Sequence, residues 1–272
     1  MTRYLPVFIF FPVLLALSAG ANALELTGNF TQGGLVIGQT QPGSRVKLDG
    51  EAVPVSDDGR FLLGFGRDAK AKSALAVTSP DGVRQTRSLK IKARVYREQR
   101  INGLPRRKVT PAPEDIARIA ADNKIIVATR AGITRRAYYG SGFKWPVTGP
   151  ISGVFGSLRI LNGTPKNPHN GVDIAAPAGT VIVAPADGVV TVAQPDMFYT
   201  GKTVMLDHGY GLTSVYAHMS ALLVRQGDVV AQGTPIGKVG RTGRVTGPHL
   251  HWGVTLMATH LDPQLLAGPM PE

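Results

Sequence analysis

One stretch in the C-terminal half organises this sequence, Gly247-Pro248-His249-Leu250-His251-Trp252-Gly253-Val254. Its apolar and β-favouring residues predict a strand, and in a strand residues two apart point to the same face. His249 and His251 are therefore expected on one face, with Leu250 on the other. Two imidazoles on one rigid face form half of a metal site or half of an acid–base site, so the argument depends on further ligands upstream.

Two upstream segments offer such ligands. His169 and Asp173 lie four residues apart, so in an extended segment both point the same way, and the Asn170-Gly171 bend can bring them towards a shared ion. His218 ends the strand-like run that begins at Val215. The chain has no cysteine, which excludes thiolate ligands. Zinc in hydrolases commonly takes three His or carboxylate ligands and leaves a fourth position for water.

These motifs occur in a characteristic order: H-x-x-x-D, then Y-A-H, then G-P-H-L-H-W-G-V. The set closely resembles the lysostaphin/LytM-type zinc metallopeptidases, which cut the peptide part of bacterial peptidoglycan, and the resemblance covers roughly residues 143–265. It implies one Zn²⁺ bound by His169, Asp173 and His251. It also implies a catalytic pair, His218 and His249, that faces the open position. Which of the two acts as base and which stabilises the oxyanion stays open.

Other polar residues near these motifs could contact substrate. Arg241 and Arg244 lie in the loop that leads to the active strand and could hold a substrate carboxylate, because arginine pairs well with carboxylates. Solvated loop charges are the default interpretation of both residues. Asn170 could contact substrate or serve only the bend. His208, in the turn-like segment 207–211, and His260, after the last core strand, are expected to be solvated.

The first 23 residues have the layout of a secretory signal. Arg3 precedes an apolar run over residues 4–17, and Ala21-Asn22-Ala23 fits a cleavage site between Ala23 and Leu24. The apolar run is shorter than the about 20 residues that a membrane helix needs. We therefore expect export, to the periplasm rather than the medium, with no stable membrane anchor after signal removal.

The rest of the chain predicts a mainly β protein. Residues 24–100 carry recurrent Gly turns between short apolar runs, typical of a small Ig-like β-sandwich, with a strand expected over residues 89–96. Residues 101–144 predict a linker with a helix that opens at Pro111–Asp115. Residues 145–265 predict a compact antiparallel β metallopeptidase domain, and residues 266–272 a tail. The first domain could be a spacer, a docking module or a lid.

The formal net charge of +12 suits anionic partners, but no interleaved aromatic platform supports nucleic acid. The expected partners are the stem peptides and cross-links of peptidoglycan, and the protein is expected to be a monomer. The resemblance thus implies a zinc endopeptidase that cleaves these cross-links with a metal-activated water. A periplasmic location would favour the D-alanyl–diaminopimelate bond, and a glycine bridge is the alternative bond. The alternative is a catalytically silent wall-binding protein that activates other hydrolases, and retention of all five site positions argues against it.

Overall fold

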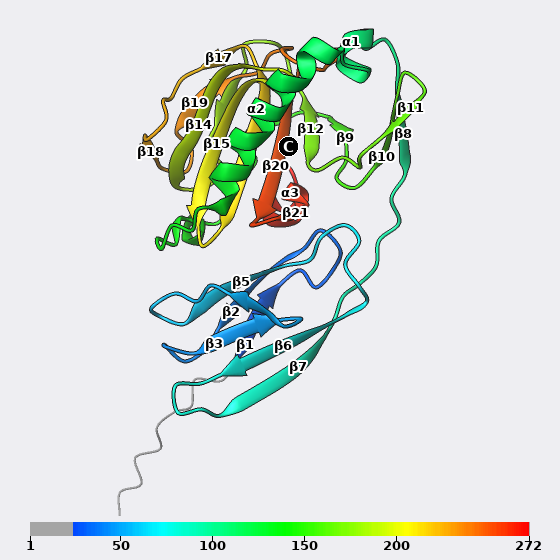
Figure 1. The fold of residues 1–272 in the computed structure, drawn as a ribbon. Helices are drawn as coiled ribbons and strands as arrows, with labels where there is room; N and C mark the ends of the chain where they lie inside the picture. The colour runs from blue at the N-terminus through cyan, green and yellow to red at the C-terminus, as the bar shows by residue number, and fades with distance from the viewer. Residues whose placement is uncertain (1–23, 272) are drawn as a thin grey trace, which may run out of the picture.

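The protein forms two lobes in a computed structural model that describes residues 24–271 (Figure 1). The first lobe contains β1 to β7, and the second contains the elements from β8 onward. The expected signal segment, up to Ala23, lies outside the described residues, and Leu24 is the first residue described. No helix within residues 24–271 combines the length and apolar character needed to cross a bilayer.

Two sheets build the N-terminal lobe. One has the order β1-β2-β5 and the other β4-β3-β6-β7. Their bounds are β1 Glu25–Gly28, β2 Leu35–Gln39, β3 Arg45–Leu48, β4 Glu51–Val53, β5 Arg60–Gly64, β6 Lys72–Thr78 and β7 Arg84–Lys90. Phe61, Leu75 and Val36 are among the buried side chains that fill the space between the sheets. The mainly β fold class predicted from the sequence is therefore confirmed.

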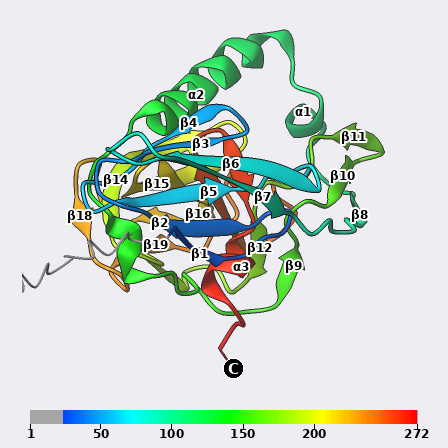
Figure 2. The same cartoon turned by 90° about the horizontal axis from the view of Figure 1, so that it is seen from below.

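Strands β2 and β5 carry buried side chains on both faces of their sheet, whereas β1 is largely exposed. Val36 and Leu63 point into the core of the N-terminal lobe, whereas Leu35 and Leu62 join the core of the C-terminal lobe. Burial on both faces explains why these strands read as continuous apolar runs rather than alternating ones. The N-terminal lobe is therefore joined to its neighbour by a packed core, and Figure 2 shows its sheets stacked over the C-terminal lobe.

The strand expected over residues 89–96 ends early. β7 stops at Lys90, and although Leu89 and Ile91 are buried, Val95 is 98% exposed. The alternating pattern was misleading because the chain leaves the sheet to reach the C-terminal lobe. There Arg94 Nη1 donates to Asp262 Oδ2 at 2.8 Å, and the Tyr96 ring meets Phe155 edge-on.

Three sheets form the C-terminal lobe within the described residues. The largest has the order β18-β14-β15-β16-β20-β12-β9, with β21 paired to β20; the others are β13-β19-β17 and β11-β10-β8. The strands are β8 Glu98–Ile101, β9 Ile151–Gly153, β10 Leu158–Leu161, β11 Thr164–Lys166, β12 Val172–Ala175, β13 Val181–Val183, β14 Gly188–Met197, β15 Gly201–Gly209, β16 Leu212–Met219, β17 Ala221–Leu222, β18 Val229–Val230, β19 Pro235–Lys238, β20 His249–Leu256 and β21 Thr259–Leu261. The helices are α1 Arg106–Val109, α2 Pro113–Ala131, the 3₁₀ turn η1 Tyr138–Ser141 and α3 Pro263–Ala267.

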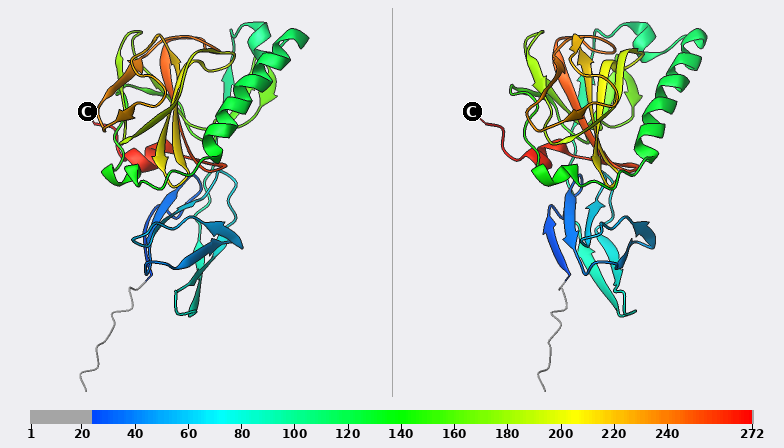
Figure 3. Two further views of the ribbon diagram at one scale, coloured as in Figure 1. Left: turned by 60° about the vertical axis from the view of Figure 1, so that its left-hand side comes forward. Right: turned by 90° about the vertical axis from the view of Figure 1, so that its left-hand side faces the viewer.

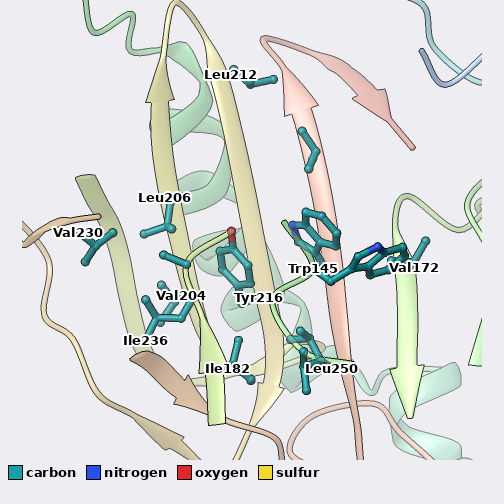
Figure 4. Packing of buried hydrophobic residues seen from close by; sticks show 14 of the residues in the cluster. Trp145, Val172, Ile182, Val204, Leu206, Leu212, Tyr216, Val230, Ile236 and Leu250 are labelled. Atoms are coloured by element: carbon teal, nitrogen blue, oxygen red, sulfur yellow. The ribbon is translucent and has the colours of Figure 1, made fainter. Parts of the chain in front are cut away.

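The core of this lobe lies between the large sheet and the segments that cover one of its faces. Val204, Tyr216 and Leu250 come from three neighbouring strands and are fully buried (Figure 4). Trp145, from the loop before β9, packs edge-on against Trp252 with 5.7 Å between the ring centres. This apolar face holds the strands at fixed positions. The polar side chains of the same strands can therefore be placed accurately on the opposite face.

Helix α2 lies along the outside of this lobe, as both views of Figure 3 show. The predicted helix is present, but its apolar positions are largely unburied: Ile116 is 55% exposed and Val127 is 64% exposed. Polar contacts hold it instead. Arg118 Nη2 donates to Asp196 Oδ2 at 2.7 Å, and Asp122 Oδ2 accepts from the backbone N–H of Phe198 at 2.7 Å.

The ion pair between the lobes allows a direct test. Replacing Arg94 by leucine leaves the buried Asp262 carboxylate without its counter-ion, and we expect the free energy of unfolding at neutral pH to fall by about 2 kcal/mol. Burial already raises the pKa of Asp262, and loss of Arg94 would raise it further. The folded variant would then bind a proton on Asp262 more tightly than the folded unchanged protein does. The loss of stability caused by the substitution should therefore shrink as the pH falls to about 4.

Urea unfolding at both pH values measures the effect. Arg84→Leu, at an exposed position of β7, is the matched control and should change stability little. An Arg94→Leu loss of equal size at both pH values would contradict this account of the interface.

Candidate metal centre and its groove

The register between β12 and β20 sets the geometry of the site. These strands are antiparallel, and Asp173 stands directly opposite His251. Because directly paired residues share a face, the carboxylate meets the imidazole, and His251 Nδ1 lies 2.9 Å from Asp173 Oδ1. His249, two residues earlier on the same strand, brings its Nε2 to 3.9 Å from the same oxygen. The shared face expected for the two histidines is therefore present.

His169 completes a cluster of three possible ligands. Its Nε2 lies 3.1 Å from Asp173 Oδ1 and 2.9 Å from His251 Nδ1, and the three atoms lie within 4.8 Å of one another. His169 Nδ1 lies 3.1 Å from the carbonyl of Val154, so a proton on Nδ1 leaves the lone pair of Nε2 facing the cluster. Two imidazole nitrogens and one carboxylate oxygen are a donor set that fits Zn²⁺.

The protonation states also suit a metal. Burial lowers the pKa of His169 to about 4, so its imidazole is neutral at neutral pH. Burial raises the pKa of Asp173, but His169 and His251 more than offset this and hold it well below its usual value. The cluster therefore presents an ionised carboxylate and a neutral imidazole, which are the forms that bind metal.

Arg159 supports the carboxylate from its other side. Its Nη2 donates to Asp173 Oδ2, which leaves Oδ1 for the two histidines. Space for this contact depends on Gly153, because a Cβ there would lie 2.4 Å from Asp173 Oδ2. The sequence interpretation missed Arg159, since nothing in its spacing links residue 159 to residue 173. The pairing is a contact between strands of two different sheets, β10 and β12, and exists only in the folded chain.

His218 reaches the site through an unusual backbone conformation. Its neighbour Ala217 is paired with His251, so regular alternation would turn His218 to the opposite face. The φ of His218 is +67°, a left-handed value that costs a non-glycine residue about 1–2 kcal/mol. As a result its ring lies 4.9 Å from the ring of His249.

Backbone carbonyls orient both of these rings. His218 Nδ1 lies 2.9 Å from the carbonyl of Thr242, and His249 Nδ1 lies 2.9 Å from that of Gly247. A proton on each Nδ1 leaves each Nε2 free as an acceptor. Burial, with further contributions from His249 and His251, holds the pKa of His218 well below its ordinary value. Its ring is therefore neutral at physiological pH.

A groove of about 630 Å³ is lined in part by His169, His218 and His251. Asn123 of α2 contributes to its wall, and Asn170 and Arg244 line it as well. Arg241 is exposed and is not among the residues that line the groove. The structure thus gathers all five residues predicted for metal binding and catalysis, together with two of the three predicted for substrate.

Comparison with known proteins assigns the family. The model of peptidase family M23 matches residues 167–263. The crystal structure of an M23 peptidase from Pseudomonas aeruginosa is 30% identical, with a TM-score of 0.67, over 88% of this chain and 95% of its own. This chain belongs to peptidase family M23. The region that matches the M23 model contains all five of the gathered residues.

Two curated proteins are similar to part of this M23 chain. One is the DD-carboxypeptidase/endopeptidase Mpg of Neisseria meningitidis, 45% identical over 104 residues. The other is the peptidoglycan DD-endopeptidase ShyA of Vibrio cholerae, 46% identical over 103 residues. Each alignment covers 38% of this chain, and this chain spans about a quarter (24%) of the length of each relative.

Two other histidines of this M23 protein differ from the sequence expectation. His208 was expected in a solvated turn, but β15 extends to Gly209 and the His208 side chain is fully buried between the carbonyl of Asp187 and the hydroxyl of Ser214. His260 was expected in solvent, but it lies in β21 and its Nδ1 is 3.2 Å from Thr255 Oγ1. Both were misjudged because strands longer than their apolar runs continue through glycine and polar positions.

The left-handed backbone of His218 predicts a stability difference between two variants that both lack the imidazole. His218→Gly should be more stable than His218→Ala by about 1 kcal/mol, because glycine adopts a φ of +67° without steric cost. Urea unfolding of the two purified variants measures the difference.

Ala217, one residue earlier in the same strand and fully buried, is the matched control. Ala217→Gly should lower stability, because its backbone is not left-handed and glycine only adds entropy to the unfolded chain. A His218→Ala variant as stable as the glycine variant would show that residue 218 carries no strain.

Proposed function

We propose that this M23 protein is a zinc-dependent endopeptidase that hydrolyses the peptide cross-links of bacterial peptidoglycan. The observation that carries the proposal is the convergence of His169, Asp173 and His251 beside the ring pair of His218 and His249, along one open groove. The named activities of the similar regions in Mpg and ShyA support peptidoglycan as the substrate.

In this proposal His169, Asp173 and His251 hold one Zn²⁺. When bound, the metal supplies Lewis acidity, which polarises a carbonyl and lowers the pKa of water. Arg159 keeps the Asp173 carboxylate turned towards the two histidines through its contact with Oδ2. Val154 fixes the ring orientation of His169 in the same way.

In this proposal His218 and His249 transfer the protons. His218 lines the groove, and in both rings a proton on the Nδ1 that faces a backbone carbonyl leaves Nε2 able to accept a proton. The neutral ring of His218 can accept a proton from the attacking water, and an imidazolium can return a proton to the leaving amine. The two rings stand in equivalent arrangements, so the proposal assigns proton transfer to the pair rather than one role to each.

The same proposal includes export to the cell wall. The signal-like segment before Leu24 would deliver the protein there, and a periplasmic location would favour a direct D-alanyl–diaminopimelate cross-link as the bond that is cleaved. Fragments released from two purified walls, one directly cross-linked and one glycine-bridged, would be identified by mass spectrometry. Cleavage at a cross-link supports the proposal; a zinc-loaded protein that releases nothing from either wall overturns it in favour of a silent regulator.

Substitutions at the five residues should separate metal binding from catalysis. We expect His218→Ala and His249→Ala to lower turnover by at least about 100-fold while zinc is largely retained, because each removes a proton-transfer group. Asp173→Ala should lose zinc as well as activity, since it removes one of three ligands. Metal analysis of the purified variants and release of soluble wall fragments are the two measurements.

His260→Ala is the matched histidine control and should keep the zinc content of the unchanged protein. Full activity in both the His218 and His249 variants would show that the catalytic pair is wrongly assigned. Zinc retained at full occupancy by Asp173→Ala would show the same for the ligand set.

A further inference from the structure

The side chain of Arg244 lies in the groove without an acidic partner. Arg159 also lines the groove, but it is paired with Asp173, whereas Arg244 forms no ion pair with any carboxylate of residues 24–271. Burial lowers the pKa of its guanidinium, and the positive charge of Arg159 acts in the same direction. A partly buried cation without a counter-ion is costly to the folded protein, so an anion supplied from outside would relieve this cost.

The guanidinium is also held in place before any ligand binds. Its Cζ lies 4.5 Å from the centre of the Tyr199 ring. The backbone N–H of Arg244 donates to the backbone carbonyl of Tyr199 at 2.8 Å. Gly243 permits this close approach, because its φ is +79° and a Cβ there would lie 2.4 Å from the same carbonyl oxygen. Arg244 is therefore positioned by the backbone and by an aromatic face, like a residue of a preformed binding site.

The same loop ties Arg244 to the catalytic pair. Thr242, two residues earlier, accepts the hydrogen bond that orients His218, and His218 and Arg244 line the same groove. A group bound by Arg244 would thus lie at a fixed place relative to the ring that transfers protons. In a groove that binds peptide, the anion with the matching geometry is a carboxylate, which arginine can hold with two parallel hydrogen bonds.

We propose that Arg244 forms a subsite for a free carboxylate of the substrate, close to the scissile amide, so that the groove selects cross-links that carry an ionised carboxyl group there. The proposal rests on the endopeptidase function proposed above. A direct cross-link to the second amine of a diamino dicarboxylic acid, such as diaminopimelate, places such a carboxyl on the carbon that bears the scissile nitrogen. A glycine bridge, or a cross-link whose carboxyl is amidated, offers no charge at that place.

The test uses two synthetic cross-linked peptide dimers that differ only at this carboxyl, one free and one as the primary amide. The unchanged protein should cleave the free acid with a kcat/KM about 10- to 100-fold higher, as expected for a hydrogen bond between charged groups. Arg244→Ala should lose about this factor on the free acid and less than about threefold on the amide. Arg244→Lys, which keeps the charge but not the paired hydrogen bonds, should fall between them.

Arg225→Ala is the control for loss of one positive charge, since Arg225 is exposed and does not line the groove. Equal losses on both dimers in Arg244→Ala would overturn the proposal and leave Arg244 a structural role. Equal cleavage of the two dimers by the unchanged protein would also overturn the proposal, whatever the variants show. Cleavage of neither dimer by the unchanged, zinc-loaded protein would instead count against the endopeptidase function.

Discussion

The pairing of Asp173 with His251 across two antiparallel strands is the constraint on which the site depends. A slip of one residue in this register would turn one of the two side chains to the apolar face and dissolve the cluster. The large buried side chains behind the sheet prevent such a slip, because Trp252 and Ile174 occupy the core face of the same two strands. The packing of the core and the placement of the polar cluster are thus two consequences of one register.

The site also shows local conflict with that regular geometry. His218 departs from strand alternation to reach the face that carries His249 and His251, and its backbone is held by a hydrogen bond from its N–H to the carbonyl of Thr200. Strained residues of this kind persist where the surroundings over-determine them. Here the surroundings include the loop that carries Thr242 and Arg244, so the orientation of the His218 ring and of the groove arginine depends on one segment.

The N-terminal lobe is built into this arrangement rather than tethered to it. Leu35 and Leu62 belong to the core of the C-terminal lobe, and Asp262 is held by both Arg94 and the carbonyl of Gly33. Among the roles open from the sequence, a flexible spacer is the one least compatible with these contacts. Helix α2 is attached differently from the N-terminal lobe. It lies beside the groove, is held by polar contacts and leaves Ile116 and Val127 exposed to solvent.

The sequence by itself determined the mainly β class and the helix that opens within residues 111–115, because these patterns are local properties of the chain. The five residues that meet at the centre were predicted from motifs that resemble the lysostaphin/LytM-type metallopeptidases, since strand alternation alone would have turned His218 away. The sequence could not place Arg159 on Asp173 or separate the groove-lining Arg244 from the exposed Arg241, and it misjudged the burial of His208. Those features depend on which strands become neighbours and on how the loops between them pack. Only the tertiary structure decided them, since contacts between residues far apart in the chain leave no mark on the spacing of either partner.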